Sequence, residues 1–332
     1  MQNNSYKALV VKETSPDSYT REIETKTINE LPQGDLLIRV HYSSLNYKDA
    51  LSASGNRGVT KSYPHVPGID AAGVVEESNS KDFSPGDKVI ATGFDLGMNT
   101  SGGYGQYIRI PAEWALHCPQ QLSLKESMIY GTAGFTAAQS VHKLVNFPVL
   151  PDQGKILISG ATGGVGSIAV SIMAKLGYSI TAVSGKPDAK NFLTRLGAEE
   201  IISRQQATDS SGRLLLKEKW AGVIDTVGGE ILATSIKSTA YGGVVTCCGN
   251  VASPELPLSV YPFILRGVSL LGIDSAKCPI HIREKIWQKL AGVWKIENID
   301  SLVTECRLPE LSAIIEKMLQ GRQSGRVIVN LL

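Results

Sequence analysis

Apolar and polar positions alternate over short distances in the first 120 residues, as they do in β-strands that face a core on one side. Apolar-rich segments are separated there by turn segments such as LPQGD, SPGD and SGGYG. Glycine, proline and aspartate in those segments favour chain reversal. The N-terminal part is therefore predicted to be a β-rich barrel or folded sheet. Its predicted strands are residues 6–11, 36–42, 71–75, 87–91 and 105–110.

The pattern changes at about residue 125, where apolar strands begin to alternate with segments of helical periodicity. This alternation is typical of a parallel sheet covered by helices, and six strands complete a doubly wound Rossmann sheet. The predicted strands are residues 155–159, 179–183, 199–202, 222–227, 243–248 and 268–273. The predicted helices are residues 164–176, 188–196 and 230–240.

The C-terminal tail shows two helical segments between residues 280 and 320 and then a final strand, GRVIVNLL. A strand that follows a complete six-stranded sheet is expected to return to the first domain. With 332 residues, the chain is long enough for two domains. We therefore expect an α/β protein with a β-rich domain of residues 1–122 and 277–332 and a doubly wound domain of residues 123–276.

Composition excludes several functional classes. The 33 basic residues nearly balance 31 acidic residues, and no basic cluster is dense enough to follow a nucleic-acid backbone. We expect no membrane span, because no apolar stretch approaches about 20 residues. The first residues lack the basic and apolar parts of a signal peptide, so a cytoplasmic location is expected. The five cysteines show no C-x-x-C spacing and are interpreted as small buried apolar residues.

The clearest motif is ILISGATGGVGSIAV at residues 156–170, which reads as an apolar strand, a glycine turn and a helix. Such a turn directs backbone N–H groups and the positive helix end at a pyrophosphate, and Gly163, Gly164 and Gly166 leave room for it. We interpret the motif as a dinucleotide-binding turn because six predicted strands surround it. The alternative is a turn between strand and helix that binds nothing. A short-chain dehydrogenase is excluded, since no tyrosine has a lysine four residues later.

The end of the second strand of this sheet predicts which dinucleotide binds. An NAD enzyme places an acidic residue there, about 20 residues after the turn, to accept from the ribose 2′-hydroxyl. This chain has Ser184, Gly185 and Lys186 instead, and Arg204 follows the third strand. Open space and positive charge favour the 2′-phosphate of NADPH. The alternative is that both cations are solvated loop residues.

The order of the two halves, together with the segments PGIDAAG, PGDKV and GGYGQY, resembles the medium-chain dehydrogenase/reductase superfamily. Within it, the segments SSLNYKDAL, PHVPGIDAAG, YGTAGFTAAQS and YPFILRGVSLLGIDS resemble the YhdH/YhfP type, which groups quinone oxidoreductases with NADPH-dependent acrylyl-CoA reductases. The resemblance covers essentially the whole chain. It implies a GroES-like catalytic domain formed by the N-terminal part and the tail, a Rossmann NADP-binding domain between them, and a homodimer.

The resemblance also implies a zinc-independent enzyme. Asn46, Ile69 and the region of Ile129 stand where zinc alcohol dehydrogenases have a cysteine, a histidine and a second cysteine. None of these residues is an ordinary zinc ligand. The four-cysteine structural lobe of those enzymes is missing too, because no cysteine precedes Cys118. We therefore expect no metal.

Without a metal, reduction of an already polarised acceptor is easier than oxidation of an alcohol. Hydride adds to an electron-poor carbon while an oxygen gains negative charge, which requires hydrogen-bond donors and then a proton. Asn46 is the candidate donor to that oxygen. Tyr47 is a candidate for binding the nicotinamide end or delivering the proton, with a packing role as the alternative.

The resemblance assigns further site residues. Asn46, Asp49, Asp70 and Arg326 match residues proposed to line the active site of related proteins. The alternative is structural: Asp70 and Arg326 form an ion pair between distant parts of the chain, and Asp49 caps the short helix that follows it. Further cofactor contacts implied by the resemblance are Thr162, Val165, Asn250, Ile264 and Ser275.

The leading hypothesis is an NADPH-dependent reductase of activated double bonds, whose small-molecule substrate is a quinone or a short enoyl-CoA thioester. Arg57 and Lys61, in the loop of residues 54–65, slightly favour the thioester because CoA carries phosphates. The alternative is a nucleotide-binding sensor or structural protein with little turnover. The sequence leaves the acceptor, the proton donor, the hydride face and the dimer interface open.

Overall fold

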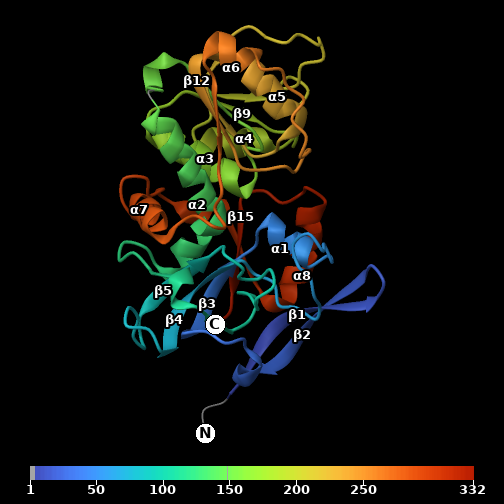
Figure 1. The fold of residues 1–332 in the computed structure, drawn as a ribbon, viewed down its shortest axis with the longest axis vertical. Helices are drawn as coiled ribbons and strands as arrows, with labels where there is room; N and C mark the ends of the chain where they lie inside the picture. Colours follow the sequence, from blue (N-terminus) through green and yellow to red (C-terminus); the bar gives the residue numbers. More distant parts are fainter. Residues whose placement is uncertain (1–3, 148) are drawn as a thin grey trace. The chain divides into compact units, whose positions relative to one another are not determined.

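The computed structural model describes residues 4–147 and 149–332. The chain folds into two compact units (Figure 1). Unit 1 comprises Met1–Thr132, Ala276–Gly292 and Asn298–Leu332, and unit 2 comprises Ala133–Ser275 and Val293–Glu297. The division falls inside helix α2 (Leu124–Asn146), whereas the sequence places a boundary before residue 123.

Unit 1 is built on a seven-stranded sheet of order β14-β15-β3-β4-β5-β7, with β6 paired to β3. Its strands are β3 (Leu36–Ser44), β4 (Asp70–Ser78), β5 (Lys88–Thr92), β6 (Tyr107–Ile110), β7 (Ala115–His117), β14 (Val303–Arg307) and β15 (Arg326–Asn330). β15 lies antiparallel to β3, with Ile328 opposite Ser44. The prediction that the final strand returns to the N-terminal sheet is therefore confirmed.

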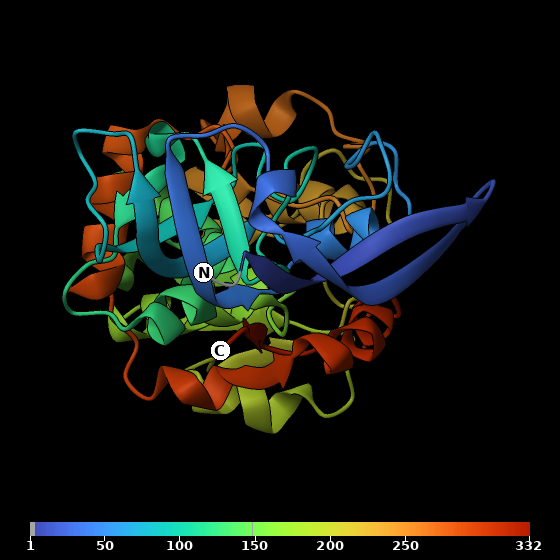
Figure 2. The same ribbon diagram turned by 90° about the horizontal axis from the view of Figure 1, so that it is seen from below.

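A two-stranded ribbon, β1 (Ser5–Ser15) and β2 (Ser18–Thr27), projects from the rest of unit 1 (Figure 2). β1 was expected, but β2 was not, because its sequence SYTREIETKT carries polar residues on both faces. Arg21 on β2 forms a salt bridge from its Nη2 to Glu316 on α8 (Leu308–Leu319) at 2.6 Å. Main-chain pairing with β1, rather than burial, thus holds β2 in place.

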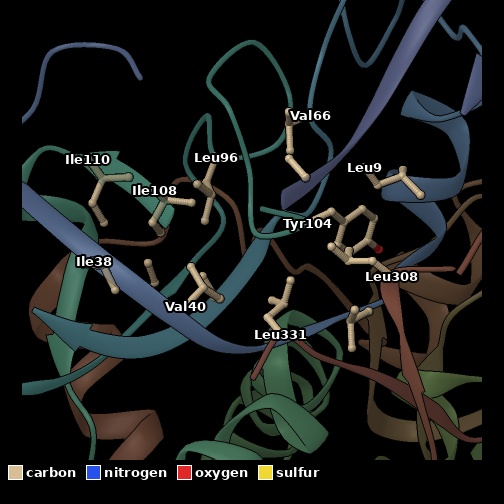
Figure 3. Packing of buried hydrophobic residues seen from close by; sticks show 14 of the residues in the cluster. Leu9, Ile38, Val40, Val66, Leu96, Tyr104, Ile108, Ile110, Leu308 and Leu331 are labelled. Carbon is tan, nitrogen blue, oxygen red and sulfur yellow. The ribbon is translucent and has the colours of Figure 1, made fainter. Parts of the chain in front are cut away.

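The core of unit 1 lies between the sheet, the first strand and the C-terminal helix. Figure 3 labels part of it, including Ile38 on β3, Ile108 on β6 and Tyr104. Leu9 donates its N–H to the Tyr104 carbonyl at 2.9 Å, which brings β1 against this core. The remaining helices of unit 1 are α1 (Tyr47–Ser52), the first part of α2, α7 (Ile280–Ala291) and the short 3-10 helices η1 (Ile28–Glu30), η2 (Ala112–Trp114) and η4 (Ile299–Leu302).

Unit 2 contains a six-stranded parallel sheet of order β10-β9-β8-β11-β12-β13. Its strands are β8 (Lys155–Ile158), β9 (Ile180–Val183), β10 (Glu200–Ile202), β11 (Trp220–Asp225), β12 (Thr239–Cys247) and β13 (Ser269–Gly272). In order of appearance this is 3-2-1-4-5-6, the Rossmann arrangement, which reverses between β8 and β11. β11 is buried along its whole length, as a central parallel strand should be. The predicted GroES-like and Rossmann fold is confirmed.

Helices α3 (Gly164–Lys175), α4 (Ala189–Arg195) and α5 (Gly229–Lys237) follow the predicted positions around the sheet (Figure 1). One boundary was wrong, because the helix predicted to run to residue 240 ends at Lys237 and β12 begins at Thr239. β12 passes through Gly242, whose φ is +72°, so the glycines lie inside the strand rather than after the helix. The sequence did not reveal α2, α6 (Tyr261–Arg266) or the 3-10 helix η3 (Pro151–Gln153). Within the described part of the chain, no helix has both the length and the apolar character needed to cross a membrane.

Candidate functional site

The first candidate site lies in unit 1, where the chain leaves β3 and enters α1. Asp49 is fully buried in α1 and accepts hydrogen bonds from the N–H of Asn46 at 2.8 Å and from that of Ile69 at 2.8 Å. The Asp49 carboxylate thus fixes the turn at Asn46 against the residue that precedes β4. Asp49 was considered as the cap of a helix that follows it, but it lies inside α1, whose N-cap is Asn46; its carboxylate forms the N3 half of a capping box.

Asp70, the first residue of β4, is also fully buried. Its carboxylate accepts from Asn46 Nδ2 at 2.8 Å, from the Thr132 N–H at 2.8 Å and from Thr132 Oγ1 at 2.6 Å. The Ser44 hydroxyl also donates to it. Four donors from three residues therefore satisfy a charge that would otherwise be costly to bury.

Arg326, the first residue of β15, brings the opposite charge into the same cluster and is 2% exposed. Its guanidinium donates to the carbonyl of Ile129 and the hydroxyl of Ser44, both at 2.8 Å, and to Asn46 Oδ1 at 3.2 Å. Ser44 and Asn46 also bind Asp70. The alternative of an ion pair between Asp70 and Arg326 is therefore replaced by a linkage through two neutral side chains.

Asp70 and Arg326 each bind a backbone group of α2. These groups are available because the helix breaks at Gly131, where φ is +50° and ψ is −155°. The break releases the Ile129 carbonyl for Arg326 and the Thr132 N–H for Asp70. The carbonyl end of one helical segment thus faces a cation, and the N–H end of the next faces an anion, as the helix dipole favours. A Cβ on Gly131 would lie 2.5 Å from Asp70 Oδ2 and 2.6 Å from Ser44 Oγ, so the site also requires glycine for space.

Asn46 occupies the centre of this cluster and is 8% exposed. Its Oδ1 faces a donor, Arg326, and its Nδ2 faces an acceptor, Asp70, so its two amide atoms are chemically distinguished. Nδ2 also lies 3.5 Å from Ser44 Oγ, which is itself bonded to Asp70 Oδ2. One N–H of the amide is directed at this pair, and the Asn46 side chain also interacts with the Asp49 carboxyl group.

Burial dominates the electrostatics of the cluster. It raises the pKa of Asp49 to about 7, and the negative charge of Asp70 adds to this effect. Burial also lowers the pKa of Arg326, against which the charges of Asp70 and Asp49 act. The pKa of Tyr104, fully buried beside Asp49, is raised well above its usual value by burial and by that carboxyl group. Asp49 is thus the group of this cluster that titrates near neutral pH.

The sequence reasoning placed Asn46, Asp70 and Arg326 in a site, and the structure brings these three together. It missed Ser44 and Thr132, which are ordinary polar residues by type. A signal for Ser44 exists, since two consecutive serines end β3 just before Asn46. Tyr47 begins α1 and is 39% exposed.

The loop after α1 carries the cations considered for CoA phosphates. Arg57 is already paired with Glu13 of the ribbon at 2.6 Å and lies over the ring of Tyr63. It also donates to the Lys61 carbonyl at 2.7 Å. Arg57 therefore has a structural role in this loop, while the Lys61 residue is exposed.

The second candidate site is the glycine turn of unit 2, between β8 and α3. Gly160 has a φ of +57°, and Gly163 immediately precedes the first turn of α3. A Cβ on Gly166 would overlap the Gly160 carbonyl, so glycine is needed there for close packing of helix against turn. Thr162 is buried and Val165 half-buried in the same turn. The predicted strand, turn and helix are all present, with the N-terminus of a 12-residue helix at the turn.

Arg204 lies against Gly185 at the end of β9. The register explains this, because Ile202 on β10 is opposite Val183 on β9 and both chains continue two residues further. A Cβ on Gly185 would lie 2.7 Å from Arg204 Nε. Burial lowers the pKa of the neighbouring Lys186, and the charge of Arg204 lowers it further. Two cations therefore converge where the sequence expected the 2′-phosphate, beside Ser184, whose hydroxyl accepts from the Lys186 N–H at 3.1 Å.

The remaining expected cofactor residues lie on separate segments. Asn250 follows β12 and is exposed, and Ser275 follows β13 and is half-buried. Both therefore lie beyond the carboxyl ends of parallel strands, the edge where doubly wound sheets bind ligands. Ile264 is on α6 and is 67% exposed.

Comparison with known proteins gives two matching family models. The alcohol dehydrogenase GroES-like domain matches residues 32–120, and the zinc-binding dehydrogenase model matches residues 164–291. YhfP of Bacillus subtilis is 44% identical over 320 residues, which cover 96% of this chain and 97% of that protein. Acrylyl-CoA reductase AcuI of Ruegeria pomeroyi is 39% identical over 98% of this chain and 99% of its own.

Solved structures match equally well. The YhdH oxidoreductase of Salmonella enterica in complex with NADP has a TM-score of 0.95 at 37% identity, covering 98% of this chain and 100% of that chain. B. subtilis YhfP with NAD bound also has a TM-score of 0.95, at 43% identity, covering 98% and 99% of the two chains.

One family model is named for zinc binding. The donor atoms at the three positions that correspond to zinc ligands decide whether this chain fits the metal. Asn46 offers an amide already bonded on both sides, and Ile69 offers no side-chain donor. The carbonyl of Ile129 accepts from Arg326, a cation. Across residues 4–147 and 149–332, no three histidine, cysteine, aspartate or glutamate side chains are grouped to hold a metal ion. The residues at these positions do not fit a zinc site.

Proposed function

Because the chain belongs to the medium-chain dehydrogenase/reductase family, in the zinc-independent type that includes YhfP, YhdH and AcuI, we propose that it is an NADPH-dependent reductase of activated double bonds. Unit 2 binds the dinucleotide, and unit 1 binds the acceptor. NADPH supplies a hydride when bound, and the protein supplies the hydrogen bonds that stabilise the charge formed on the acceptor.

The orientation of Asn46 is the observation that carries this proposal. Arg326 and Asp70 hold its amide in one orientation, so that a donor of fixed direction is available for an acceptor oxygen. When hydride adds to the electron-poor carbon of an enone, enoyl thioester or quinone, the electron pair of the double bond moves toward that oxygen. A donor fixed in advance stabilises the developing negative charge without reorganisation. A proton then completes the reduction, and Tyr47 is the candidate for its delivery because it is exposed next to Asn46.

The pair Lys186 and Arg204 supports NADPH over NADH. Both are cations beside Gly185, in the place where NAD enzymes have a ribose-binding acid. The turn residues Thr162 to Gly166 hold the pyrophosphate, while Asn250, Ile264 and Ser275 contribute further contacts. AcuI and YhdH are the relatives that link this chain to acrylyl-CoA reduction and to NADP, whereas YhfP was solved with NAD.

The acceptor is either a short enoyl-CoA such as acrylyl-CoA or a quinone. The similarity to AcuI over nearly the whole chain supports the thioester. The loop of residues 54–65 gives weaker support than its sequence suggested, because Arg57 is held by Glu13. Lys61 is the cation in this loop whose side chain we propose for the CoA phosphates.

A kinetic comparison tests the function. NADPH oxidation is followed at 340 nm with acrylyl-CoA and with benzoquinone, for the wild type and for Asn46→Ala. Removing one oxyanion donor costs about 10²- to 10³-fold in kcat, and we expect a loss in this range for the better acceptor. Asn79→Ala, an exposed asparagine of unit 1, is the matched control. Tight NADPH binding with no turnover of either acceptor would contradict the proposal and support the alternative of a nucleotide-binding sensor.

We also propose that the protein is a homodimer joined through unit 2. Exposed apolar side chains gather in the sequence around α6, and β13 is an edge strand of the unit 2 sheet with its far side unpaired within the described residues. These residues are Val251, Leu256, Val260, Tyr261, Ile264 and Leu265. Apolar patches of this kind mark association surfaces. Light scattering should give twice the chain mass for the wild type and a smaller mass for Val260→Lys; a wild-type monomer would contradict the proposal.

A further inference from the structure

Asp225 is a fully buried carboxylate at the end of β11, next to the point where the strand order of unit 2 reverses. Its Oδ1 accepts from Ser159 Oγ at 2.7 Å, and its Oδ2 accepts from the N–H groups of Gly228 at 2.8 Å and Val227 at 3.2 Å. The parallel register explains the first contact, because Ile224 lies opposite Ile158 and the next residues are neighbours. Burial raises the pKa of Asp225, and these hydrogen bonds act against that shift. The fold thus tolerates a costly carboxylate at this position.

The same residues determine the start of the glycine turn. Ser159 Oγ accepts from the Thr226 N–H at 2.8 Å, and Thr226 Oγ1 donates to the Ser159 carbonyl at 2.9 Å. Gly160 follows Ser159 with a φ of +57°, and a Cβ there would overlap Thr226 Oγ1. The first residue of the dinucleotide turn is therefore packed against the loop that follows β11, and Ser159 links that turn to Asp225.

The loop after β11 is joined in turn to the loop after β12. The Val227 carbonyl accepts from the Ala252 N–H at 2.8 Å, and a Cβ on Gly228 would overlap the Ser253 carbonyl. A Cβ on Gly249 would overlap the Thr226 carbonyl. Three loops at the carboxyl ends of β8, β11 and β12 are therefore held together, with the Asp225 carboxylate bonded to two of them.

We propose that Asp225, acting through Ser159, is a positioning residue that holds these loops in the arrangement that receives the dinucleotide. The inference rests on the proposed function, because it presupposes that NADPH binds at the glycine turn. A turn already fixed before binding loses less conformational entropy when the ligand arrives, so loss of the contact weakens affinity. The Asp225 carboxylate acts on the turn and not on the carbon that accepts hydride. Its loss therefore changes kcat little.

The test measures NADPH affinity apart from chemistry. Ser159→Ala removes the link to the turn but leaves Asp225 its two backbone donors, and Asp225→Asn removes the charge. A lost hydrogen bond to a charged group corresponds to roughly a tenfold change or more, so we expect the Kd for NADPH, from fluorescence titration, to rise about tenfold in each variant. We expect kcat to stay within about twofold. The Kd of the double variant should rise by less than the product of the two single increases, because both substitutions remove the same contact.

The control is Ser235→Ala, a buried serine of α5 whose hydroxyl donates within its own helix to the Ile231 carbonyl at 2.7 Å. It should lower the melting temperature without changing the Kd. If wild type binds NADPH and Ser159→Ala binds it equally well, this inference fails while the proposed function stands. If wild type binds no NADPH, both fail. Should Asp225→Asn not fold, the Ser159→Ala result alone decides.

Discussion

Gly131 separates two helical segments where a side chain would meet the Asp70 carboxylate, since a Cβ on residue 131 would lie 2.5 Å from Asp70 Oδ2. It would also lie 2.9 Å from a guanidinium nitrogen of Arg326. Both the space and the positive φ of +50° require glycine there. The helix break therefore makes room for the buried charges and supplies their backbone partners at the same time.

Gly131→Ala is therefore expected to disrupt the site as well as the fold. The methyl group must displace Asp70 or Ser44, which breaks the hydrogen bonds that orient Asn46. We expect reductase activity to fall at least about 100-fold, as for loss of an oxyanion donor. Activity at saturating NADPH and urea unfolding are the two measurements.

Gly86→Ala is the matched control for this variant. Gly86 has a φ of +95°, but nothing lies within 4 Å of its Cβ position. Alanine there incurs only the backbone strain, about 1–2 kcal/mol, and should leave activity intact. Equal losses of activity in the two variants would show that packing against Asp70 is unimportant.

Arg204→Ala is expected to change the choice of cofactor. Arg204 crosses Gly185 beside Lys186, so its loss removes a charge-assisted hydrogen bond to the 2′-phosphate of about 1.5–3 kcal/mol. The KM for NADPH should rise by roughly 10- to 100-fold, while the KM for NADH changes little. Arg195→Ala, an exposed arginine in the last turn of α4, serves as the control. An equal rise in the KM for NADH would mean that Arg204 supports the fold and does not recognise the 2′-phosphate.

The sequence predicted that Lys186 and Arg204 favour the 2′-phosphate, and the parallel register of β9 and β10 explains why the structure brings them together. The alternation of apolar strands with helical segments predicted the Rossmann sheet, whose strands are buried and therefore apolar. It did not reveal β2, which has polar residues on both faces and is held by main-chain pairing with β1. Strand prediction from burial fails where a ribbon buries little.

The site in unit 1 was less predictable for a related reason. Ser44 and Thr132 are 26 and 62 positions from Asp70 in the chain, and only the tertiary fold brings them to its carboxylate. Neither serine nor threonine indicates a functional site by residue type alone. The break at Gly131 was hidden too, because the sequence did not reveal α2 itself.

The pH dependence of folding stability is expected to reflect the titration of Asp49. Its folded pKa of about 7 lies above the usual value, mainly because of burial. As pH rises from about 4 to 7, the unfolded chain releases this proton before the folded chain does, so folding stability falls across that window. One proton corresponds to at most about 1.4 kcal/mol per pH unit.

Urea unfolding at several pH values between 5 and 8 checks this expectation. Asp49→Asn removes the titrating group, so its stability should fall less steeply with pH than that of the wild type. Asp82→Asn, an exposed aspartate of the same unit, should keep the wild-type slope. Identical slopes in all three proteins would mean that Asp49 does not hold its proton into the neutral range.

The charges of Asp70 and Arg326 are expected to depend on each other although Ser44 and Asn46 lie between them. Asp70→Asn removes one of the two carboxyl groups, Asp70 and Asp49, that act on the buried guanidinium, and Arg326→Met removes the cation that acts on Asp70. Leaving a buried charge uncompensated costs about 3–5 kcal/mol. The double variant contains neither charge, so its loss of stability should be well below the sum of the two single losses. Urea unfolding of the four proteins gives this coupling directly. Additive losses would show that the neutral side chains, and not the opposite charge, compensate each buried ion.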